Sequence, residues 1–498
     1  MRTQRSHGRR SEGALVVTDW ETVIGLEVHC ELATATKMFC SCANEFGAEP
    51  NTHVCPVCLG LPGSLPVLNE KAVEYALRVG EAFHFDVPET SIFHRKNYFY
   101  PDMPKDYQIS QFDEPITSDG WLEIDGARIG ITRAHLEEDT GKSLHVGGGG
   151  RIHDASHSLV DYNRAGVPLL EIVSEPDIRS AEQAKAYVDE LRGTLFAIGV
   201  SDVKMEEGSL RVDANVSVRP VGTGELRTRC EIKNLNSLRS LIRAIEYEVE
   251  RQVATHEAGE HLVQETRHWD EDAGRTTSGR SKEEAHDYRY FPEPDLVPVA
   301  PTAEMREHAR ANMPELPAAR RQRLLTDWDI KHEDARVLVE VPGLADYAER
   351  AVAALTGGTP KDVVNWVRQE VLAYLNETGL SPAVLAPEML AELVGLVAAG
   401  TISRNQARDV LDESMREEKW PRTVVEARGL AQVSDEGELG TAVDSVLAAN
   451  PDVVAQYRAG DEKERKKKRG FLMGELMKSL EGKGNPQALN KLLDDRLS

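Results

Sequence analysis

Three segments of the sequence alternate between apolar and polar residues, and this pattern limits the possible fold more than any other feature. The segments are VIGLEVHCEL (23–32), LRVDANVSVR (210–219) and CEIK (230–233). Successive side chains of a β-strand point to opposite faces, so each segment predicts a strand with one apolar and one polar face. Strands that bury only one face are typical of antiparallel sheets. The sequence therefore predicts an antiparallel sheet in the first part of the chain.

Helix signals accompany these strands. Ser180 and Gln183 have the spacing of a capping box, and the helical segment that they begin stops at Gly199. Apolar residues also recur at helical spacing between Leu238 and Val249. Strands and helices of this kind together predict an α+β domain built on an antiparallel sheet. From about residue 300 onward the sequence is rich in Ala, Leu and Glu, which predicts mostly helices.

Two stretches of the sequence are candidate domain boundaries. Closely spaced prolines in PEPDLVPVAPTAEM (292–305) disfavour regular structure, while Gly400 can end one helix and Ser403 can cap the next. We therefore expect an α+β domain over 20–298, an all-α domain over 299–402 and a small all-α tail over 403–498. Residues 1–19 lack the apolar segment of a secretory signal and are expected to form a disordered arm.

The polar faces of the three predicted strands carry groups suited to cations and phosphates. The first strand offers Glu27, His29 and Glu31, the second Arg211, Asp213 and Asn215, and the third Glu231 and Lys233. Carboxylates on one face repel each other unless cations neutralise them. Carboxylates combined with imidazole suit Mg²⁺ or Mn²⁺, and nearby Arg and Lys suit phosphates. An ordinary solvated sheet face is the other interpretation, and alternation alone leaves both open.

Further acids could join this face. Residues 133–143 contain Glu137, Glu138 and Asp139, and residues 168–177 place Glu171 within an apolar run. An isolated carboxylate among Leu and Ile is costly to bury unless it has a partner or a metal. Alternation does not decide which of the adjacent Glu137 and Glu138 would reach the site.

Four of the six cysteines lie within residues 37–60. Cys40 and Cys42 form a C-x-C pair, and Cys55 and Cys58 form a C-x-x-C pair. Two close pairs joined by a loop are typical of a tetrahedral zinc site, and this spacing favours zinc over a set of ordinary buried thiols. Because four thiolates leave no open ligand position, the predicted role is structural.

The charge of the chain limits how it could bind nucleic acid. The formal net charge is −24, so the chain as a whole repels RNA and any contact needs a local basic patch. KERKKKR (463–469) is one such patch, although a charged run is also typical of a solvated helix face. No apolar run is long enough to predict a membrane span. With no secretory signal, we expect a reducing cytoplasmic location.

Six longer segments have a combined pattern that is specific to one protein family. They are VIGLEVHCEL (23–32), HRKNYFYPDMPKDYQISQFDEPI (94–116), ITRAHLEEDTGKS (131–143), VDYNRAGVPLLEIVSEPD (160–177), VSDVKMEEGSLRVDANVSVRP (200–220) and DYRYFPEPDL (287–296). Together they resemble the B subunit of the aspartyl/glutamyl-tRNA(Asn/Gln) amidotransferase, from about residue 20 to the end. The resemblance implies a catalytic cradle domain, a helical domain and a small tail similar to free-standing YqeY-type proteins.

The resemblance also implies a reaction in two halves. The γ-phosphoryl group of ATP is transferred to the side-chain carboxylate of Glu on tRNA(Gln), or of Asp on tRNA(Asn), and ammonia then displaces phosphate. The first half needs charge neutralisation around a loose phosphoryl transition state. The sequence does not decide between the two tRNA substrates.

The resemblance implies specific roles for residues of the polar face. It assigns His29, Glu138 and Glu171 to a first Mg²⁺ or Mn²⁺ shell, with Glu27 close by. It implies an anion clamp at Arg211 and contacts to ATP phosphates or a second metal from Asp213, Asn215, Glu231 and Lys233. In this context Lys466, Lys467, Lys468 and Arg469 are expected to contact tRNA phosphates. Since some members of the family lack the cysteine quartet, zinc is expected to brace the cradle and take no part in the chemistry.

The family further implies partner proteins. An amidase, known as the A subunit, releases ammonia from glutamine, and a small C subunit wraps the assembly to give a heterotrimer. Two other classes of function would use parts of the same sequence. A zinc-braced tRNA-binding protein without catalysis would have no need for the acids and imidazole together, and a different ATP-dependent, carboxylate-activating ligase would need them for another substrate.

Overall fold

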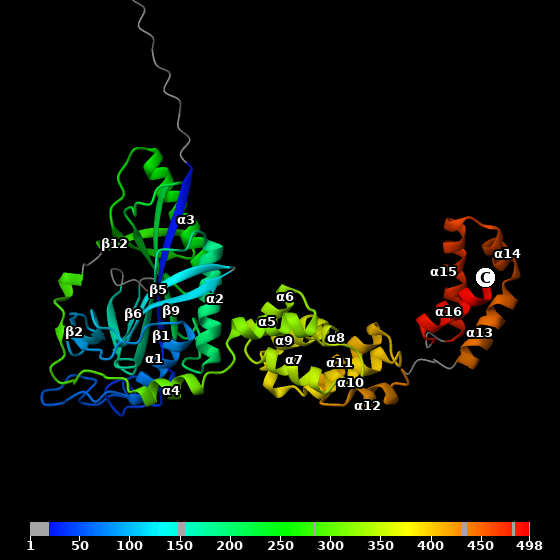
Figure 1. The fold of residues 1–498 in the computed structure, drawn as a ribbon, viewed down its shortest axis with the longest axis horizontal. Helices are drawn as coiled ribbons and strands as arrows, with labels where there is room; N and C mark the ends of the chain where they lie inside the picture. Colours follow the sequence, from blue (N-terminus) through cyan, green and yellow to red (C-terminus); the bar gives the residue numbers. More distant parts are fainter. Residues whose placement is uncertain are drawn as a thin grey trace, which may run out of the picture. The chain divides into compact units, whose positions relative to one another are not determined.

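The computed structural model describes residues 19–124, 126–147, 155–281, 285–430, 436–480 and 484–497. The predicted N-terminal arm, apart from Asp19, lies outside the described residues. The chain divides into two compact units, Met1–Pro317 and Ala318–Ser498, and each is described by itself (Figure 1).

A large, mostly antiparallel sheet forms the centre of the first unit. Among the described residues its order is β12-β11-β10-β9-β1-β8-β5-β3-β2-β13, and β4 adds to β5. The strands are β1 (Trp20–Glu31), β2 (Phe93–Asn97), β3 (Tyr107–Gln111), β4 (Thr117–Ile124), β5 (Ala127–Glu138), β8 (Pro168–Ser174), β9 (Leu210–Pro220), β10 (Cys230–Leu235), β11 (Glu265–Asp270), β12 (Arg275–Ser281) and β13 (Phe291–Pro292). A separate ribbon pairs β6 (Lys142–Val146) with β7 (His157–Asp161).

The alternating segments form strands in which the apolar residues face the core. In β1, Ile24, Leu26, Val28 and Cys30 are each at most 1 % exposed, whereas Glu27 and His29 are half-buried on the opposite face. Antiparallel pairing of β1 with β9 and of β9 with β10 repeats the same division between the faces. The three predicted strands are therefore confirmed, and their polar residues share one face of one sheet.

Helices cover the apolar face of this sheet. They are α1 (Glu70–Ala82), α2 (Ala181–Ala197), α3 (Leu238–Glu257) and α4 (Ala303–Ala311), and their buried residues join those of the strands in one core. In Figure 1, α2 and α3 run along the same side of the sheet. The predicted signals of α2 are confirmed, because the Ser180 side chain accepts from the Gln183 N–H and Gly199 follows with a φ of +70°. A short 3₁₀ turn (Ala285–Tyr288) precedes β13.

A bulge in β5 changes which of its residues face the core. The pairing of β5 with β8 shifts register between Ile131 and Arg133. Before the shift Ile129 and Ile131 are buried, and after it Ala134 and Leu136 are buried. An extra residue in one strand reverses the alternation beyond it. The bulge thereby determines which face of the sheet Glu137 and Glu138 point to at the end of β5.

The second unit is helical and contains two hydrophobic cores. The first core joins residues between Leu324 and Val425, and the second joins residues between Leu439 and Leu497. The helices of the first core are α5 (Pro317–Trp328), α6 (His332–Glu340), α7 (Leu344–Ala353), α8 (Pro360–Trp366), α9 (Leu372–Thr378), α10 (Pro387–Ala398), α11 (Arg404–Glu417) and α12 (Pro421–Ala427), with a π-helical turn (Val367–Val371) and a 3₁₀ turn (Pro382–Val384). The second core is formed by α13 (Glu436–Ala449), α14 (Pro451–Ala459), α15 (Glu462–Ser479) and α16 (Pro486–Leu497).

The α+β class followed by helical parts is confirmed, while the domain boundaries predicted at 298 and 402 stay predictions. Ser403 caps α11 as expected, yet α10 and α11 contribute to the same core. Ala309 of α4 packs in the core of the first unit. This packing supports a proposal that the boundaries lie later, after Pro317 and between Val425 and Leu439. None of the described helices combines the length and hydropathy needed to cross a membrane.

Candidate active site and cysteine cluster

A wide cavity of about 720 Å³ lies over the polar face of the sheet in the first unit. Residues of β5, β8, β1, β9 and β10 line it, because these strands are neighbours in the sheet order. The lining consists of acids, imidazoles, cationic side chains and aromatic rings. Among these are the predicted site residues Glu27, His29, Glu171, Arg211, Glu231 and Lys233.

The first group of potential ligands consists of His29, Glu137 and Glu171, and we refer to it as the first acid group. One ligand atom from each lies within 4.8 Å of the others, so the three donors can meet around a single cation. Cross-strand register produces this arrangement, because Glu171 of β8 is opposite His29 of β1 and His135 of β5. The Ser110 hydroxyl donates to Glu137 Oε2 at 3.2 Å. One imidazole and two carboxylates fit a divalent cation such as Mg²⁺ or Mn²⁺.

His135 gives this acid group a second imidazole, which the sequence analysis missed. Its Nε2 lies 3.4 Å from Glu171 Oε2 and 3.8 Å from Glu137 Oε2. Burial would lower the pKa of His135, but the charges of Glu171 and Glu137 raise that pKa to about 9. Burial would also raise the pKa of Glu171, and the two imidazoles instead hold it well below its usual range. At neutral pH Glu171 is therefore ionised next to a protonated His135.

A second acid group lies further along the same face, at Glu27, Asp213 and Glu231. Their carboxylates also have ligand atoms within 4.8 Å of one another. Asn215 Nδ2 donates to Glu27 Oε1 at 2.8 Å, and Lys233 Nζ donates to Asp213 Oδ2 at 2.7 Å. Burial lowers the pKa of Lys233, but Asp213 and Glu231 more than reverse this effect and raise it. All of the residues predicted as phosphate or second-metal contacts thus meet here, except Arg211.

Arg211 stands at one wall of the cavity, where a buried acid holds it. Its Nη2 donates to Asp139 Oδ2 at 2.6 Å, and Asp139 is only 3 % exposed. Burial would raise the pKa of Asp139, but Arg211 and Arg164 lower that pKa to about 2. Burial and the neighbouring Asp139 raise the pKa of Glu31 to about 8. The guanidinium is therefore anchored by a partner that is ionised at neutral pH, and the Arg211 side chain, which is 35 % exposed, can also contact an anion.

The structure does not bring Glu138 to the first acid group, where the resemblance had placed it. Glu138 is 2 % exposed and points to the opposite side of β5, where its Oε1 accepts from Lys105 Nζ and from the Ile109 N–H. Glu137 takes the expected place next to His29 and Glu171. The physical reason is the phase of β5 beyond its bulge, which turns Leu136 and Glu138 inward and His135 and Glu137 toward the cavity.

Lys96 is a further cavity residue that the sequence analysis did not single out. Its ammonium lies 4.9 Å from the centre of the Tyr288 ring. Burial lowers the pKa of Lys96, but Tyr290, Glu137 and Glu171 outweigh this and raise it. Its position in the motif HRKNY, at a polar site of β2, is the only sequence signal that pointed to it. Lys96 brings a positive charge to the side of the cavity that holds the first acid group.

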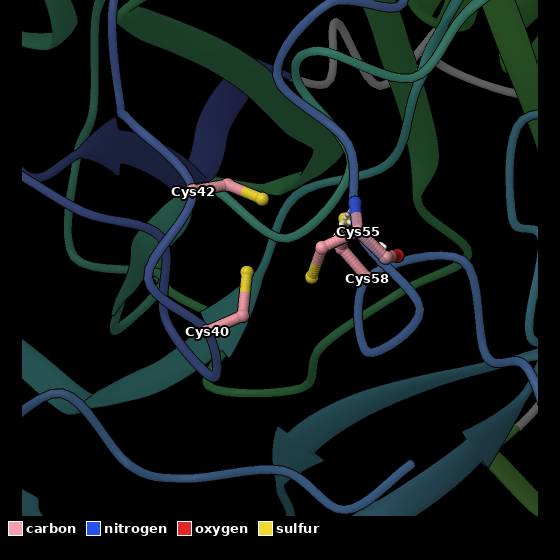
Figure 2. Close-up of side chains that lie close together, drawn as sticks. All are labelled: Cys40, Cys42, Cys55 and Cys58. Carbon is pink, nitrogen blue, oxygen red and sulfur yellow. Dashed lines mark hydrogen bonds between the residues drawn. The ribbon is translucent and has the colours of Figure 1, made fainter.

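The four predicted zinc ligands lie together beside the cradle. The sulfur atoms of Cys40, Cys42, Cys55 and Cys58 all lie within 4.8 Å of one another. Sulfur atoms at the corners of a zinc tetrahedron are about 3.8 Å apart for a Zn–S distance near 2.3 Å. Figure 2 shows the side chains of Cys40 and Cys42 turned toward the Cys55–Cys58 pair. The residues present therefore fit a closed, four-coordinate zinc site.

Local contacts favour the thiolate form of Cys58, whereas the hydrogen bond with Cys58 raises the pKa of Cys40 and burial raises the pKa of Cys42 to about 11. A hydrogen bond with Cys40 lowers the pKa of the Cys58 thiol to about 5, and the Lys37 charge acts in the same direction. Lys37 is itself fully buried, and its ammonium donates to the carbonyls of His53 and Tyr162. One buried cation thus joins the cysteine loop to the connection between β7 and β8.

The basic run lies on α15 in the second unit. Lys466 and Lys467 are exposed, whereas Arg469 forms a bidentate pair with Asp494 at 2.7 Å. Lys468 donates to Gln456. Half of the predicted RNA-contacting charge is therefore engaged within the helical bundle, and Lys466 and Lys467 are the residues most open to a partner.

The fold and the cavity together define a class of protein. A sheet face with two acid groups, flanked by Arg and Lys, has the residue types that a catalytic domain would need to bind phosphates and divalent cations. Comparison with known families shows a catalytic domain. The GatB/GatE catalytic domain matches residues 22–307, and the GatB domain matches residues 346–497.

Known relatives identify the family over nearly the whole chain. Proteins named as the B subunit of aspartyl/glutamyl-tRNA(Asn/Gln) amidotransferase are similar to it in several bacteria. The protein of Frankia casuarinae is 53 % identical and covers 97 % of this chain and 96 % of its own. That of Carboxydothermus hydrogenoformans is 51 % identical, over 96 % of this chain and 99 % of its own. The chain belongs to the family of aspartyl/glutamyl-tRNA(Asn/Gln) amidotransferase B subunits, so the predicted resemblance is confirmed.

Proposed function

We propose that this chain is the component of a tRNA-dependent amidotransferase that activates the side-chain carboxylate of Glu on tRNA(Gln), of Asp on tRNA(Asn), or of both. The observation that carries the proposal is a single cavity in which two acid groups and the cations Lys96, Arg211 and Lys233 surround one space. Membership of the family supports the choice of substrate, since its relatives are named for these two tRNAs.

The first half of the reaction transfers the γ-phosphoryl group of ATP to a carboxylate oxygen. The new bond joins that oxygen to phosphorus, the bond to the β-phosphate oxygen breaks, and ADP leaves. Arg211 and Lys233 stand where they can bind phosphate oxygens as negative charge shifts to the leaving group. Lys96 can keep the attacking carboxylate near the phosphoryl group by a charge-assisted hydrogen bond.

A divalent cation would support this half of the reaction. His29, Glu137 and Glu171 would hold it, with Glu27, Asp213 and Glu231 offering a second position. A cation bound there supplies charge neutralisation for phosphate oxygens. In this assignment Glu137 replaces Glu138 as a ligand, and Asn215 and Lys233 fix the orientation of Glu27 and Asp213 in the second acid group.

The second half of the reaction forms the amide. Ammonia attacks the carbonyl carbon of the acyl phosphate, inorganic phosphate leaves with the C–O bond electrons, and the nitrogen loses a proton to the departing phosphate. Ammonia is delivered in our proposal by a glutamine-cleaving A subunit, with a small C subunit completing the heterotrimer. No thiol among the described residues lines the cavity, and Cys30 and Cys230 are buried on the apolar face.

The proposal is tested by purifying the chain with its partner proteins and supplying both misacylated tRNAs. We expect one ADP to form for each amide, and we expect no amide without ATP. Amide formation without ATP, or none with either tRNA, would contradict the proposal. A non-catalytic tRNA-binding role is the second candidate, and it would give full tRNA binding with an amidation rate that is independent of the acid groups.

Neutralising the exposed part of the basic run should weaken tRNA binding. In a variant with Lys466→Gln and Lys467→Gln, we expect the affinity to fall and the slope of log Kd against log salt to decrease by about one for each lost phosphate contact. The measurement is a salt titration of tRNA binding to the assembled enzyme.

The matched control is a variant with Lys361→Gln and Lys419→Gln, which removes the same charge from exposed positions outside α15. It should leave the salt slope unchanged. If both variants behave alike, α15 carries only a solvated charge and the tRNA contact lies elsewhere. Lys468 and Arg469 stay in the proposal as weaker contributors, because each already has a partner within the bundle.

A further inference from the structure

One side of the cavity is lined by aromatic rings, which neither the proposed chemistry nor the sequence motifs explain. The rings belong to Tyr98, Phe112, Tyr288 and Tyr290, and we refer to them as the aromatic wall. The rings of Phe112 and Tyr290 stack with centres 4.3 Å apart and planes at 10°. The Tyr288 ring meets Tyr290 edge to face at 6.1 Å. Phosphoryl transfer needs charge and does not need such a surface.

The backbone behind the aromatic wall is held in place by specific contacts. Asn97 Nδ2 donates to the carbonyls of Tyr288 and Arg289, both at 2.9 Å. Directly after these residues, β13 pairs with β2. Arg95 Nε then donates to Glu293 Oε2 at 2.6 Å, and the Glu293 side chain is fully buried. The segment that carries two of the rings is therefore fixed before any ligand binds, which lowers the cost of binding.

Part of the ring surface of the aromatic wall is accessible from the cavity. Phe112 is 42 % exposed while it lines the cavity, so its ring is only partly covered by Tyr290. Tyr98, Tyr288 and Tyr290 are half-buried. A large apolar ring surface exposed inside a polar cavity is the usual sign of a planar apolar ligand.

The aromatic wall adjoins the groups that would handle phosphate. Lys96 lies over the Tyr288 ring, and its charge interacts with Glu137 and Glu171 of the first acid group. A ligand with a flat ring at one end and a phosphate or carboxylate at the other would match this arrangement, with its ring on the aromatic wall and its anionic end near Lys96. Both substrates of the proposed reaction have this form. ATP carries adenine, and the 3′-terminal nucleotide of tRNA, to which the amino acid is attached, is also an adenosine.

We propose that the aromatic wall binds an adenine ring by stacking, and that it thereby positions a substrate relative to the acid groups. This inference rests on the proposed function, because the two sources of adenine are its two substrates. Stacking of a base on an aromatic side chain tolerates different bases and contributes about fivefold to a hundredfold in affinity per base. Phe112 and Tyr290 form the part of the wall with the most ring surface.

The test uses the assembled enzyme with Phe112→Leu and, separately, Tyr290→Leu, which keep apolar bulk and remove the ring. Two arms distinguish the sources of adenine. The first compares equilibrium binding of ATP and of inorganic tripolyphosphate, which has the phosphates without the base. The second measures the KM for the misacylated tRNA at saturating ATP. Tyr290→Phe keeps the ring and should behave like the unchanged protein in both arms.

If the wall takes the base of ATP, the Leu variants should bind ATP about tenfold more weakly and tripolyphosphate equally well. If it takes the tRNA terminus, the KM for tRNA should rise about tenfold while ATP binding stays the same. Either result supports the proposal. Changes below about twofold in both arms, for both Leu variants, would overturn it.

Phe196→Leu is the matched control, because Phe196 is also 42 % exposed and does not line the cavity. It should change neither arm. If Tyr290→Leu fails to assemble with its partners, Phe112→Leu decides the question, since Phe112 is the more exposed ring. Amide formation by the unchanged enzyme with and without ATP, measured in parallel, keeps the two proposals apart. Amide formation without ATP would defeat the proposed function, whereas unchanged Leu variants defeat only the aromatic wall as a base-binding site.

Discussion

Replacing Glu137 by Gln is expected to reduce amide formation about a hundredfold to a thousandfold while tRNA binding stays within about twofold. Gln has nearly the same shape, so the fold of β5 is retained. What is lost is one negative charge from the group formed with His29 and Glu171, whose donor atoms lie within 4.8 Å of one another. A cation held by this group would lose a charged ligand and bind more weakly, and phosphate charge would be less well neutralised. The measurement is amide formed per minute with saturating ATP and tRNA.

The adjacent acid provides a stringent comparison for this prediction. Titration of the ATP-free enzyme with Mn²⁺ should show weaker binding for Glu137→Gln and for Glu171→Gln, and unchanged binding for Glu138→Gln. Glu138 lies on the opposite side of β5, where it accepts hydrogen bonds from Lys105 and Ile109. The reverse result, with Glu138→Gln alone losing Mn²⁺, would return the ligand role to Glu138 and contradict the site described above.

Replacing Cys58 by Ser is expected to have the second large effect, on zinc content and on local stability. Structural zinc sites contribute on the order of 10 kcal/mol of apparent binding free energy, so losing one ligand should release the metal. The loop between the two cysteine pairs should then unfold. Metal analysis of the purified chain should fall from one zinc to none. Cleavage by a glutamyl-specific protease should become rapid at Glu45, which is an exposed position of this loop and is followed by Phe46.

Cys230→Ser is the matched control for the cysteine prediction. Cys230 is fully buried in β10 and lies outside the cysteine cluster, so its replacement can lower the stability of the sheet but should leave the zinc content at one. Zinc retained by the Cys58→Ser protein, or absent from the unchanged chain, would show that these thiols are ordinary buried cysteines. Amidation should fall less than for Glu137→Gln, because the cysteines do not line the cavity.

The sheet and much of its chemical face could be predicted because alternation carries the needed information. Each of β1, β9 and β10 buries one side, so a polar residue at alternate positions must face the other side. Antiparallel pairing then places Glu27 opposite Asp213, and His29 opposite both Glu171 and Arg211. Alternation gave the face of each residue, whereas the pairing of the strands depends on contacts far apart in the chain, and the resemblance supplied the catalytic interpretation of this face.

The choice between Glu137 and Glu138 could not be made in the same way. Ile129 and Ile131 set one phase for β5, and continuing that phase would turn Glu137 inward. The bulge between Ile131 and Arg133 reverses it. Bulges depend on how two strands pair, so a single strand read alone does not reveal them. The later apolar residues Ala134 and Leu136 were the local signal, and they indicate that Glu138 is inward.

Other parts of the site depend on contacts between distant segments. Lys96 reaches the first acid group from β2, and Asn97 of the same strand donates to the carbonyls of Tyr288 and Arg289, which holds the segment that carries Tyr288 and Tyr290 at the cavity. Sequence spacing cannot show that segments so far apart along the chain are neighbours. The family resemblance supplied the motif that contains these tyrosines, but it gave them no role.

The bulge in β5 has a consequence for how this protein can change its length. Deleting Thr132, the residue between Ile131 and Arg133, would remove the extra residue of the bulge, and β5 could then alternate regularly with Ala134, Leu136 and Glu138 still inward. His135 and Glu137 would keep facing the cavity. A residue inserted beyond Arg133 would instead exchange the inward and outward positions that follow it. The strand can therefore lose one residue at the bulge without turning its acids away from the cavity, whereas it cannot gain one nearer its end.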